Sequence, residues 1–252
     1  MDIISFGATD IGRKRTTNED SYLVDDSLGL YVVADGMGGH AAGEVASSEA
    51  IDAIASLVTN ERKLIEDFKK GGIDVDAGLG RLSRCLESAI QSAAYLVHSI
   101  AEIDEDKIGM GTTISALLIV GEHGLTGQVG DSRVYYVRKK QTVQLTEDHT
   151  LINWQLKEGL ITPEQASVAK NRNVVTRAVG SKDYVQVDVQ SFPVHPEDKF
   201  MLCSDGLYEY INDIEIAAVL DHDPEPAVRH LVELALNRGG KDNVTSIVVE
   251  IV

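Results

Sequence analysis

The chain has 252 residues, of which 43% are apolar and 25% are charged, a composition typical of a globular protein with a large core. Its 23 basic and 40 acidic side chains give a formal net charge of −17. This charge argues against binding to the backbone of nucleic acids and to anionic membrane surfaces, so any phosphate site must be local.

Short apolar runs bounded by turn residues predict strands. In chain order, the expected strands cover residues 3–8, 22–24, 30–34, 112–120, 125–129, 133–137, 185–189, 199–203 and 245–251. The three runs between residues 112 and 137 are separated only by tight turns, which indicates an antiparallel meander.

Apolar residues at helical spacing predict two helices, around residues 51–58 and 79–100, with Gly71-Gly72 marking the break between them. Asp223 and Pro224 suit the N-cap and first position of a further helix that closes at Gly239. Ser47 and Ser48 are expected on the surface. Because strands cluster in groups and helices come in pairs, the order favours antiparallel sheets covered by helices over an alternating parallel sheet.

Residues 146–180 change character: they are polar, with short helical candidates at 150–158 and 163–170. This segment is expected to form a flap over one edge of the sheet. Its Trp154, Arg172 and Arg177 would either select a substrate or simply anchor the flap.

A recurring device links a strand to a carboxylate. The run 30–34 ends in Asp35-Gly36, and the run 199–203 is followed by Ser204-Asp205-Gly206. Taken alone, an Asp-Gly pair is most often a hairpin turn. Variants at Asp131 and Asp242 make four such aspartates, which predict a convergent cluster that would repel itself unless cations neutralised it. All-oxygen donors, including the Gly36 carbonyl, favour Mg²⁺ or Mn²⁺.

The chemistry that suits such a cluster is phosphoryl hydrolysis. Two ions about 3.5–4 Å apart can lower the pKa of a bridging water and shield phosphoryl oxygens. Arg15 could bind the phosphate oxygens in a bidentate manner, although a solvated loop charge is the more frequent role of an arginine. A cysteine phosphatase would need an arginine six positions after its cysteine. Neither cysteine has one, because the sixth residue after Cys85 is Gln91 and the sixth after Cys203 is Glu209.

The N-terminus lacks the basic and apolar segments of a signal peptide, and no apolar run approaches membrane-spanning length. Cys85 and Cys203 lie far apart in apolar surroundings, which indicates two reduced core thiols in a cytoplasmic protein. We expect one domain over residues 1–252. We also expect a monomer, since neither heptads nor a long exposed apolar stretch appears. The acidic net charge leads us to expect neither membrane nor nucleic-acid partners.

Six motifs occur in register: Arg15 with Asn18-Glu19-Asp20, then residues 35–40, 111–113, 129–133, 204–206 and 242–245. Together they resemble the bacterial type 2C (PPM family) metal-dependent Ser/Thr protein phosphatases, from Asp10 to Val249. Each motif is weak alone, and their order makes the resemblance specific.

The resemblance implies an α+β fold, a four-layer α-β-β-α sandwich of two antiparallel sheets flanked by helices. It implies hydrolysis of phosphoserine and phosphothreonine by a water bridging two Mn²⁺ or Mg²⁺ ions, with an optional third ion. The phosphoproteins would be products of bacterial Ser/Thr kinases. Matched by position, Asp35 would bridge both metals, Asp205 and Asp242 would complete the first site, and the Gly36 carbonyl would complete the second. Asp20 and Glu19 would hold metal-bound water, and Asp131 with Asp205 would hold the third ion. Arg15 would bind the phosphate, with Asn243 and Thr113 as supporting residues.

One position departs from the family pattern. Eukaryotic relatives place a histidine directly after the bridging Asp-Gly, where this chain has Met37; its histidine is His40. His40 is the candidate general acid, because histidine titrates near neutral pH. The alternative is a structural histidine that hydrogen-bonds the glycine loop.

Two other functions fit the same residues. The chain could be a pseudoenzyme that keeps the fold as a binding or sensory domain, although every matched acidic position is occupied. It could also be a two-metal hydrolase for small phosphoesters or nucleotides, which a comparison with phosphopeptides under identical metal conditions would distinguish.

Overall fold

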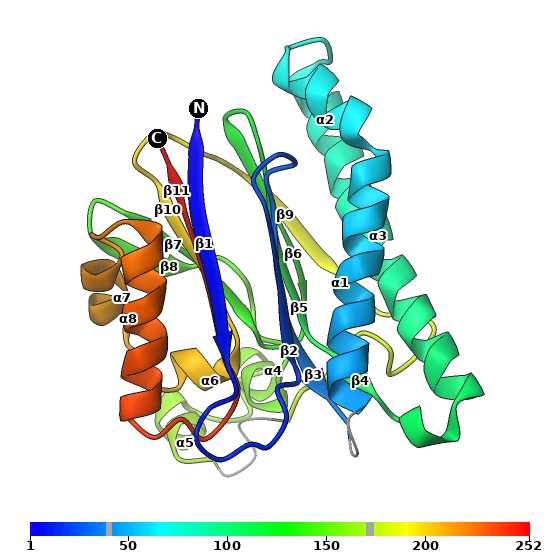
Figure 1. Cartoon of the computed structure of the whole chain (residues 1–252), viewed down its shortest axis with the longest axis vertical. Helices are drawn as coiled ribbons and strands as arrows, with labels where there is room; N and C mark the ends of the chain where they lie inside the picture. The colour runs from blue at the N-terminus through cyan, green and yellow to red at the C-terminus, as the bar shows by residue number, and fades with distance from the viewer. Residues whose placement is uncertain (39–41, 170–173) are drawn as a thin grey trace.

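The computed structural model describes residues 1–38, 42–169 and 174–252. Two antiparallel sheets pack face to face with helices on both outer sides, which confirms the predicted four-layer sandwich (Figure 1). The first sheet has the order β1 (Ile3–Asp10), β11 (Val244–Ile251), β10 (Lys199–Cys203), β7 (Arg133–Arg138) and β8 (Gln141–Gln144). The second has the order β2 (Asp20–Asp25), β3 (Leu30–Met37), β5 (Ile114–Val120), β6 (His123–Val129) and β9 (Asp188–Pro193), with β4 (Gly111–Thr112) beside β3.

The helices divide between the two outer faces (Figure 1). The second sheet is covered by α1 (Ala42–Asn60) and α3 (Val75–Ile103), with the short α2 (Arg62–Lys69) between them in sequence. The first sheet is covered by α6 (Asp205–Tyr208), α7 (Asp213–Val219) and α8 (Pro224–Asn237). A short 3-10 helix, Glu105–Lys107, follows α3.

Strand β3 has a continuously apolar sequence, and its two faces lie in different apolar layers. Leu30 and Val32 point into the core beneath α1 and α3. Tyr31 and Val33 point the other way, into the layer between the sheets, where they meet residues such as Phe200. Since both faces of the strand are covered, both sets of side chains must be apolar.

Several elements differ from the prediction. A strand was predicted at residues 185–189, but β9 begins later and covers Asp188–Pro193. Val185 and Val187 are apolar because they pack against the core beneath the helices, not because they belong to a strand. Helix α2 was not predicted, since eight residues are too few to establish a helical period. Strand β8 and helices α6 and α7 were missed for the same reason of length.

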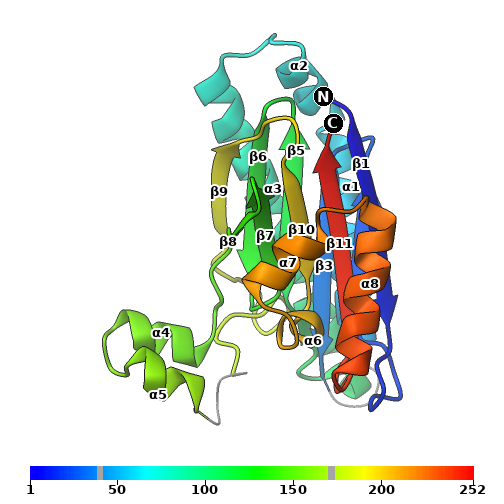
Figure 2. The same cartoon turned by 90° about the vertical axis from the view of Figure 1, so that its left-hand side faces the viewer.

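The predicted flap extends beyond one end of the sandwich (Figure 2). Its helices α4 (Leu151–Lys157) and α5 (Pro163–Ser167) are capped by Thr150 and Thr162, whose side chains accept hydrogen bonds from backbone amides. Isolated bridges pair Thr150 with Val175 and Thr112 with Val179, which return the segment to the sheet. Among the described helices, none is long and apolar enough to span a membrane.

Candidate active site

Carboxylates gather at the end of the sandwich from which the flap emerges. Asp20 and Asp35 face each other as a register pair of β2 and β3. Asp205 begins α6, one residue beyond the end of β10, Asp242 lies two residues before β11, and Asp131 lies in the turn between β6 and β7. Strand ends from both sheets therefore deliver these side chains, as the recurring Asp motif predicted.

Burial and mutual electrostatic repulsion raise the pKa values of most of these carboxyl groups. Burial raises the pKa of Asp35 well above its ordinary value, and the charges of Asp20, Asp205, Asp131 and Asp242 raise it further. Burial, then Asp131 and Asp242, raise the pKa of Asp205 to about 7. Burial also raises the pKa of Asp131 to about 6. Such a group of charges is costly unless cations or protons neutralise it.

Asp20 is held from the opposite sheet. Its Oδ2 accepts hydrogen bonds from Ser204 Oγ at 2.7 Å and from Thr245 Oγ1 at 2.6 Å. Burial raises the pKa of Asp20 to about 6, although these two bonds act in the other direction. The carboxylate thus joins β2 to the ends of β10 and β11, and fixes the spacing of the two sheets at the site.

Arg15 forms a bidentate ion pair with Asp242. Its Nε lies 2.8 Å from Oδ1 and its Nη2 donates to Oδ2 at 2.8 Å, with both side chains partly exposed. This is the fork geometry predicted for phosphate, here applied to a carboxylate. The half-buried Glu19 lies close by: burial raises its pKa, whereas Arg15 lowers it.

The side chains are gathered but do not converge on one point. Within the described ranges, no three His, Cys, Asp or Glu side chains are arranged so that they could hold a metal ion together. The reason lies in their present partners, since Asp242 is directed at Arg15 and Asp20 at hydroxyl groups.

Asn243 and Thr113 shape the backbone around the carboxylates. Asn243 accepts from the Glu19 amide at 2.9 Å and donates to the Ile11 and Thr17 carbonyls at 2.9 and 3.0 Å, which ties down the loop that carries Arg15. Thr113 Oγ1 lies 2.9 Å from the Asp35 amide, from which it accepts.

Gly36 is required because three backbone segments meet there. A Cβ at this position would lie 2.1 Å from the Gly43 carbonyl oxygen and 2.5 Å from that of Glu19. Ser47, expected on the surface, is instead fully buried, and its Oγ donates to the same Glu19 carbonyl at 2.7 Å. The spacing of small residues in α1 thus serves close packing against β3.

Some predicted residues lie elsewhere or outside the described ranges. His40, the candidate general acid, and Arg172 of the flap fall outside the described residues. Arg177 anchors the flap, because it donates to Asp188 Oδ1 at 2.8 Å. Trp154 is half exposed on α4.

Arg133 and His149 were not predicted as site residues, although Arg133 closes the motif at residues 129–133. Arg133 lies two residues after Asp131, donates to Asp148 through Nε and Nη2 at 2.9 and 2.6 Å, and stacks on the Tyr208 ring at 3.6 Å. The consecutive Asp148 and His149, both outside any helical or strand period, were the available signal.

Two cavities differ in what they border. A groove of about 670 Å³ runs between the flap and α6, and its lining includes Arg133, Asp148 and Tyr208.

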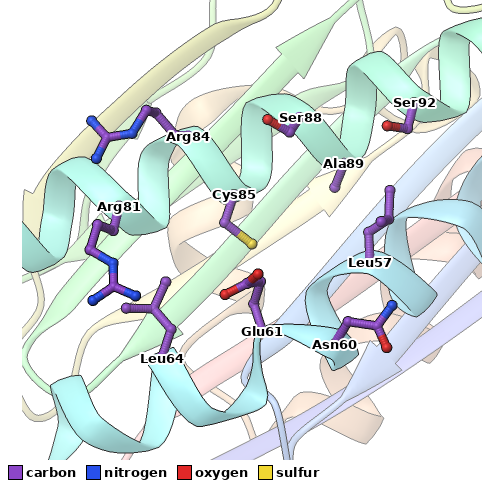
Figure 3. Close-up of a pocket in the computed structure, with 10 residues that line it drawn as sticks. All are labelled: Leu57, Asn60, Glu61, Leu64, Arg81, Arg84, Cys85, Ser88, Ala89 and Ser92. Carbon is purple, nitrogen blue, oxygen red and sulfur yellow. The ribbon is translucent and has the colours of Figure 1, made fainter.

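A second cavity of about 430 Å³ lies between α1, α2 and α3, where the Cys85 thiol faces the Glu61 carboxylate (Figure 3). Cys85 is therefore half-buried at a cavity instead of in the core. Burial and Glu61 raise the pKa of this thiol to about 11, which makes it a poor nucleophile at neutral pH.

Comparisons with known proteins agree with this geometry. Residues 14–244 match the profile of the protein phosphatase 2C family. The protein phosphatase PhpP of Streptococcus pneumoniae is 34% identical over 243 residues, covering 94% of this chain and 93% of PhpP.

Two solved structures of the phosphatase PstP superpose on nearly the whole chain. The Mycobacterium tuberculosis enzyme is 34% identical with a TM-score of 0.86, covering 99% of this chain and 98% of that one. The PstP catalytic domain in complex with two manganese ions is 33% identical with a TM-score of 0.82, at the same coverage of 99% and 98%. With the carboxylates at the sandwich end and a family match from residue 14 to 244, this chain belongs to the protein phosphatase 2C family.

Proposed function

We propose that this chain is a metal-dependent protein phosphatase that hydrolyses phosphoserine and phosphothreonine in phosphoproteins. The observation that carries the proposal is the carboxylate cluster at the end of the sandwich, in which Asp35 is surrounded by Asp20, Asp131, Asp205 and Asp242. Buried carboxylates that raise one another's pKa are a site that gains stability from divalent cations.

The donor set fits two Mn²⁺ or Mg²⁺ ions. All the candidate ligands are oxygens, the type preferred by hard cations, and a PstP catalytic domain holds two manganese ions. We assign Asp35 to both ions, Asp205 and Asp242 to the first and the Gly36 carbonyl to the second, with Asp131 beside Asp205 for a third. Bound there, the ions would supply Lewis acidity and a water of lowered pKa.

The protein's own groups then bind and orient the substrate. Arg15 would exchange its two bonds to Asp242 for two bonds to the phosphoryl oxygens, which frees the Asp242 carboxylate as a ligand. Asp20 is held by Ser204 and Thr245, so it and Glu19 can orient water at the site without moving. We keep His40 as the candidate proton donor to the leaving alkoxide.

The test is hydrolysis of p-nitrophenyl phosphate and of a phosphothreonine peptide, with Mn²⁺ and with chelator. We expect turnover that needs metal and that falls at least about a hundredfold in Asp35→Asn and Asp205→Asn. Asp221→Asn is the matched control, since this exposed aspartate forms a surface ion pair with Lys140. Metal binding without any turnover by the wild-type protein would instead indicate a pseudoenzyme, and a preference for nucleotides a small-molecule hydrolase.

We further propose that residues 1–252 act as one catalytic domain, as a monomer, on products of bacterial Ser/Thr kinases. The net charge of −17 supports the absence of nucleic-acid and anionic-membrane partners. A cytoplasmic location is supported by the free thiols of Cys85 and Cys203.

A further inference from the structure

His149 is a buried histidine that the proposed mechanism does not use. It lies where the chain leaves the first sheet for the flap, directly before the Thr150 cap of α4. Only 5% of its surface is exposed. A buried imidazole needs a partner for each ring nitrogen, and the partners of this one connect two different parts of the molecule.

One ring nitrogen faces the turn that carries Asp131. The Gly130 amide donates to His149 Nδ1 at 3.1 Å, and the His149 amide donates back to the Gly130 carbonyl at 2.9 Å. Since Nδ1 accepts, the proton of the neutral ring is on Nε2. Burial lowers the pKa of His149, which keeps the ring neutral.

The other ring nitrogen faces the base of the flap. His149 Nε2 lies 3.0 Å from Asp188 Oδ2, to which it donates. Arg177 Nη1 holds the second oxygen, Oδ1, at 2.8 Å. The neighbouring Thr176 donates its amide and its hydroxyl to the His149 carbonyl at 2.7 and 3.0 Å. The segment that returns from the flap is thereby joined to the same histidine.

From the turn, buried hydrogen bonds continue to Asp35. Gln128 Nε2 donates to the carbonyls of Gly130 and Ser132 at 3.0 and 2.8 Å. The Ser132 hydroxyl lies 2.7 Å from that of Thr113, which accepts from the Asp35 amide at 2.9 Å. The turn 130–132 is therefore held by Gln128 and Thr113 on one side and by His149 on the other.

We propose that His149 is a positioning residue of the phosphatase: it fixes the Gly130–Ser132 turn, and with it the Asp131 carboxylate, and makes that geometry depend on the flap being seated through Arg177 and Asp188. The inference rests on the proposed function. It differs from a catalytic role, because the His149 ring touches the turn and the flap and acts only through Asp131.

Two amide substitutions separate the two ring contacts. In His149→Asn the side-chain amide reaches the place of Nδ1, so an oxygen there can still accept from Gly130, while the bond to Asp188 is lost. In His149→Gln the amide reaches the place of Nε2, so the bond to Asp188 can be kept while the Gly130 amide loses its acceptor. The control is Arg138→Gln, which breaks a two-pronged ion pair with Asp198 at the other end of β7.

The readouts are amide hydrogen exchange over residues 128–133 and the Mn²⁺ concentration that half-maximally raises the melting temperature, with kcat and KM measured alongside. In His149→Gln we expect exchange to quicken, the half-maximal Mn²⁺ concentration to rise and kcat to fall, each by about tenfold, since one buried amide loses its partner. KM should stay within about twofold, because substrate binding by Arg15 is untouched.

His149→Asn should remain within about threefold of the wild type in each readout, and Arg138→Gln should match the wild type. Arg177→Gln, which leaves the histidine intact, should shift the same readouts in the direction of His149→Gln but by less. Equal behaviour of the Asn and Gln variants, or wild-type exchange over 128–133 in His149→Gln, would overturn the positioning role. Absence of turnover in the wild-type protein would instead refute the proposed function, and the exchange data would still separate the two.

Discussion

Replacement of Asn243 by alanine tests whether one side chain holds the loop that carries Arg15. Asn243 is 4% exposed and makes three hydrogen bonds to the backbone, to the Glu19 amide and to the Ile11 and Thr17 carbonyls. At about 1 kcal/mol for each buried group left without a partner, Asn243→Ala should cost about 3 kcal/mol of unfolding free energy. For a chain of this size that corresponds to a melting temperature about 6–12 °C lower.

Activity should fall as well, because a loosened loop misplaces Arg15 and Glu19. We expect kcat/KM on p-nitrophenyl phosphate to drop by about tenfold or more, at a temperature where the variant is still folded. The matched control is Asn212→Ala, which removes the cap of α7, where Asn212 accepts from the Ile214 and Glu215 amides. The control should lose about 1 kcal/mol and no activity. If both variants kept the wild-type kcat/KM, or lost equal stability, the bonds of Asn243 would not hold the site.

Three further outcomes follow from local geometry. Gly36→Ala should abolish activity and lower the melting temperature sharply, because the new Cβ would clash with the Gly43 carbonyl oxygen. Gly121→Ala, with a φ of +63° and no atom within 4 Å of the new Cβ, should cost only about 1 kcal/mol of unfolding free energy. Similar melting curves for the two variants would contradict the predicted clash at Gly36. Arg133→Lys cannot keep the two-pronged bond to Asp148 and should lose about 2 kcal/mol in urea unfolding, so a loss below about 0.5 kcal/mol would speak against that bond. Because the pKa of Cys85 is raised from 9.0 to about 11, its alkylation at pH 8 should be about a hundredfold slower than that of an unperturbed thiol and should accelerate as the pH rises; labelling at the rate of a small free thiol would contradict the burial.

The strand-to-aspartate motif was visible in the sequence because it depends on local chemistry. A buried strand needs a continuous apolar run, and the carboxylate that ends it needs glycine or serine where the backbone is crowded. Gly36 is an example: the sequence suggests a turn residue, and in the fold the backbone of Gly43 and Glu19 leaves no room there for a Cβ. Such signals lie within a few residues, so they can be read without knowing the fold.

Long-range hydrogen bonds have no such local signature. Ser47 resembles a surface residue of a helix until the fold places the Glu19 carbonyl 2.7 Å from its hydroxyl. His149 resembles a loop residue until the turn at Gly130 and the strand at Asp188 close around it. Polar residues at such places are chosen by partners far along the chain, which only packing brings within reach.

The class of fold, the gathering of carboxylates and the family could be predicted from the amino-acid sequence, because apolar periodicity and short motifs depend on residues that are close together in the chain. Only the fold shows which carboxylates lie near one another, that Arg15 pairs with Asp242, and that His149 joins the base of the flap to the Gly130–Ser132 turn. Hydrogen bonds and charge interactions act over a few ångströms in space, and Arg15 and Asp242, which form one such pair, are separated by 227 positions in the chain.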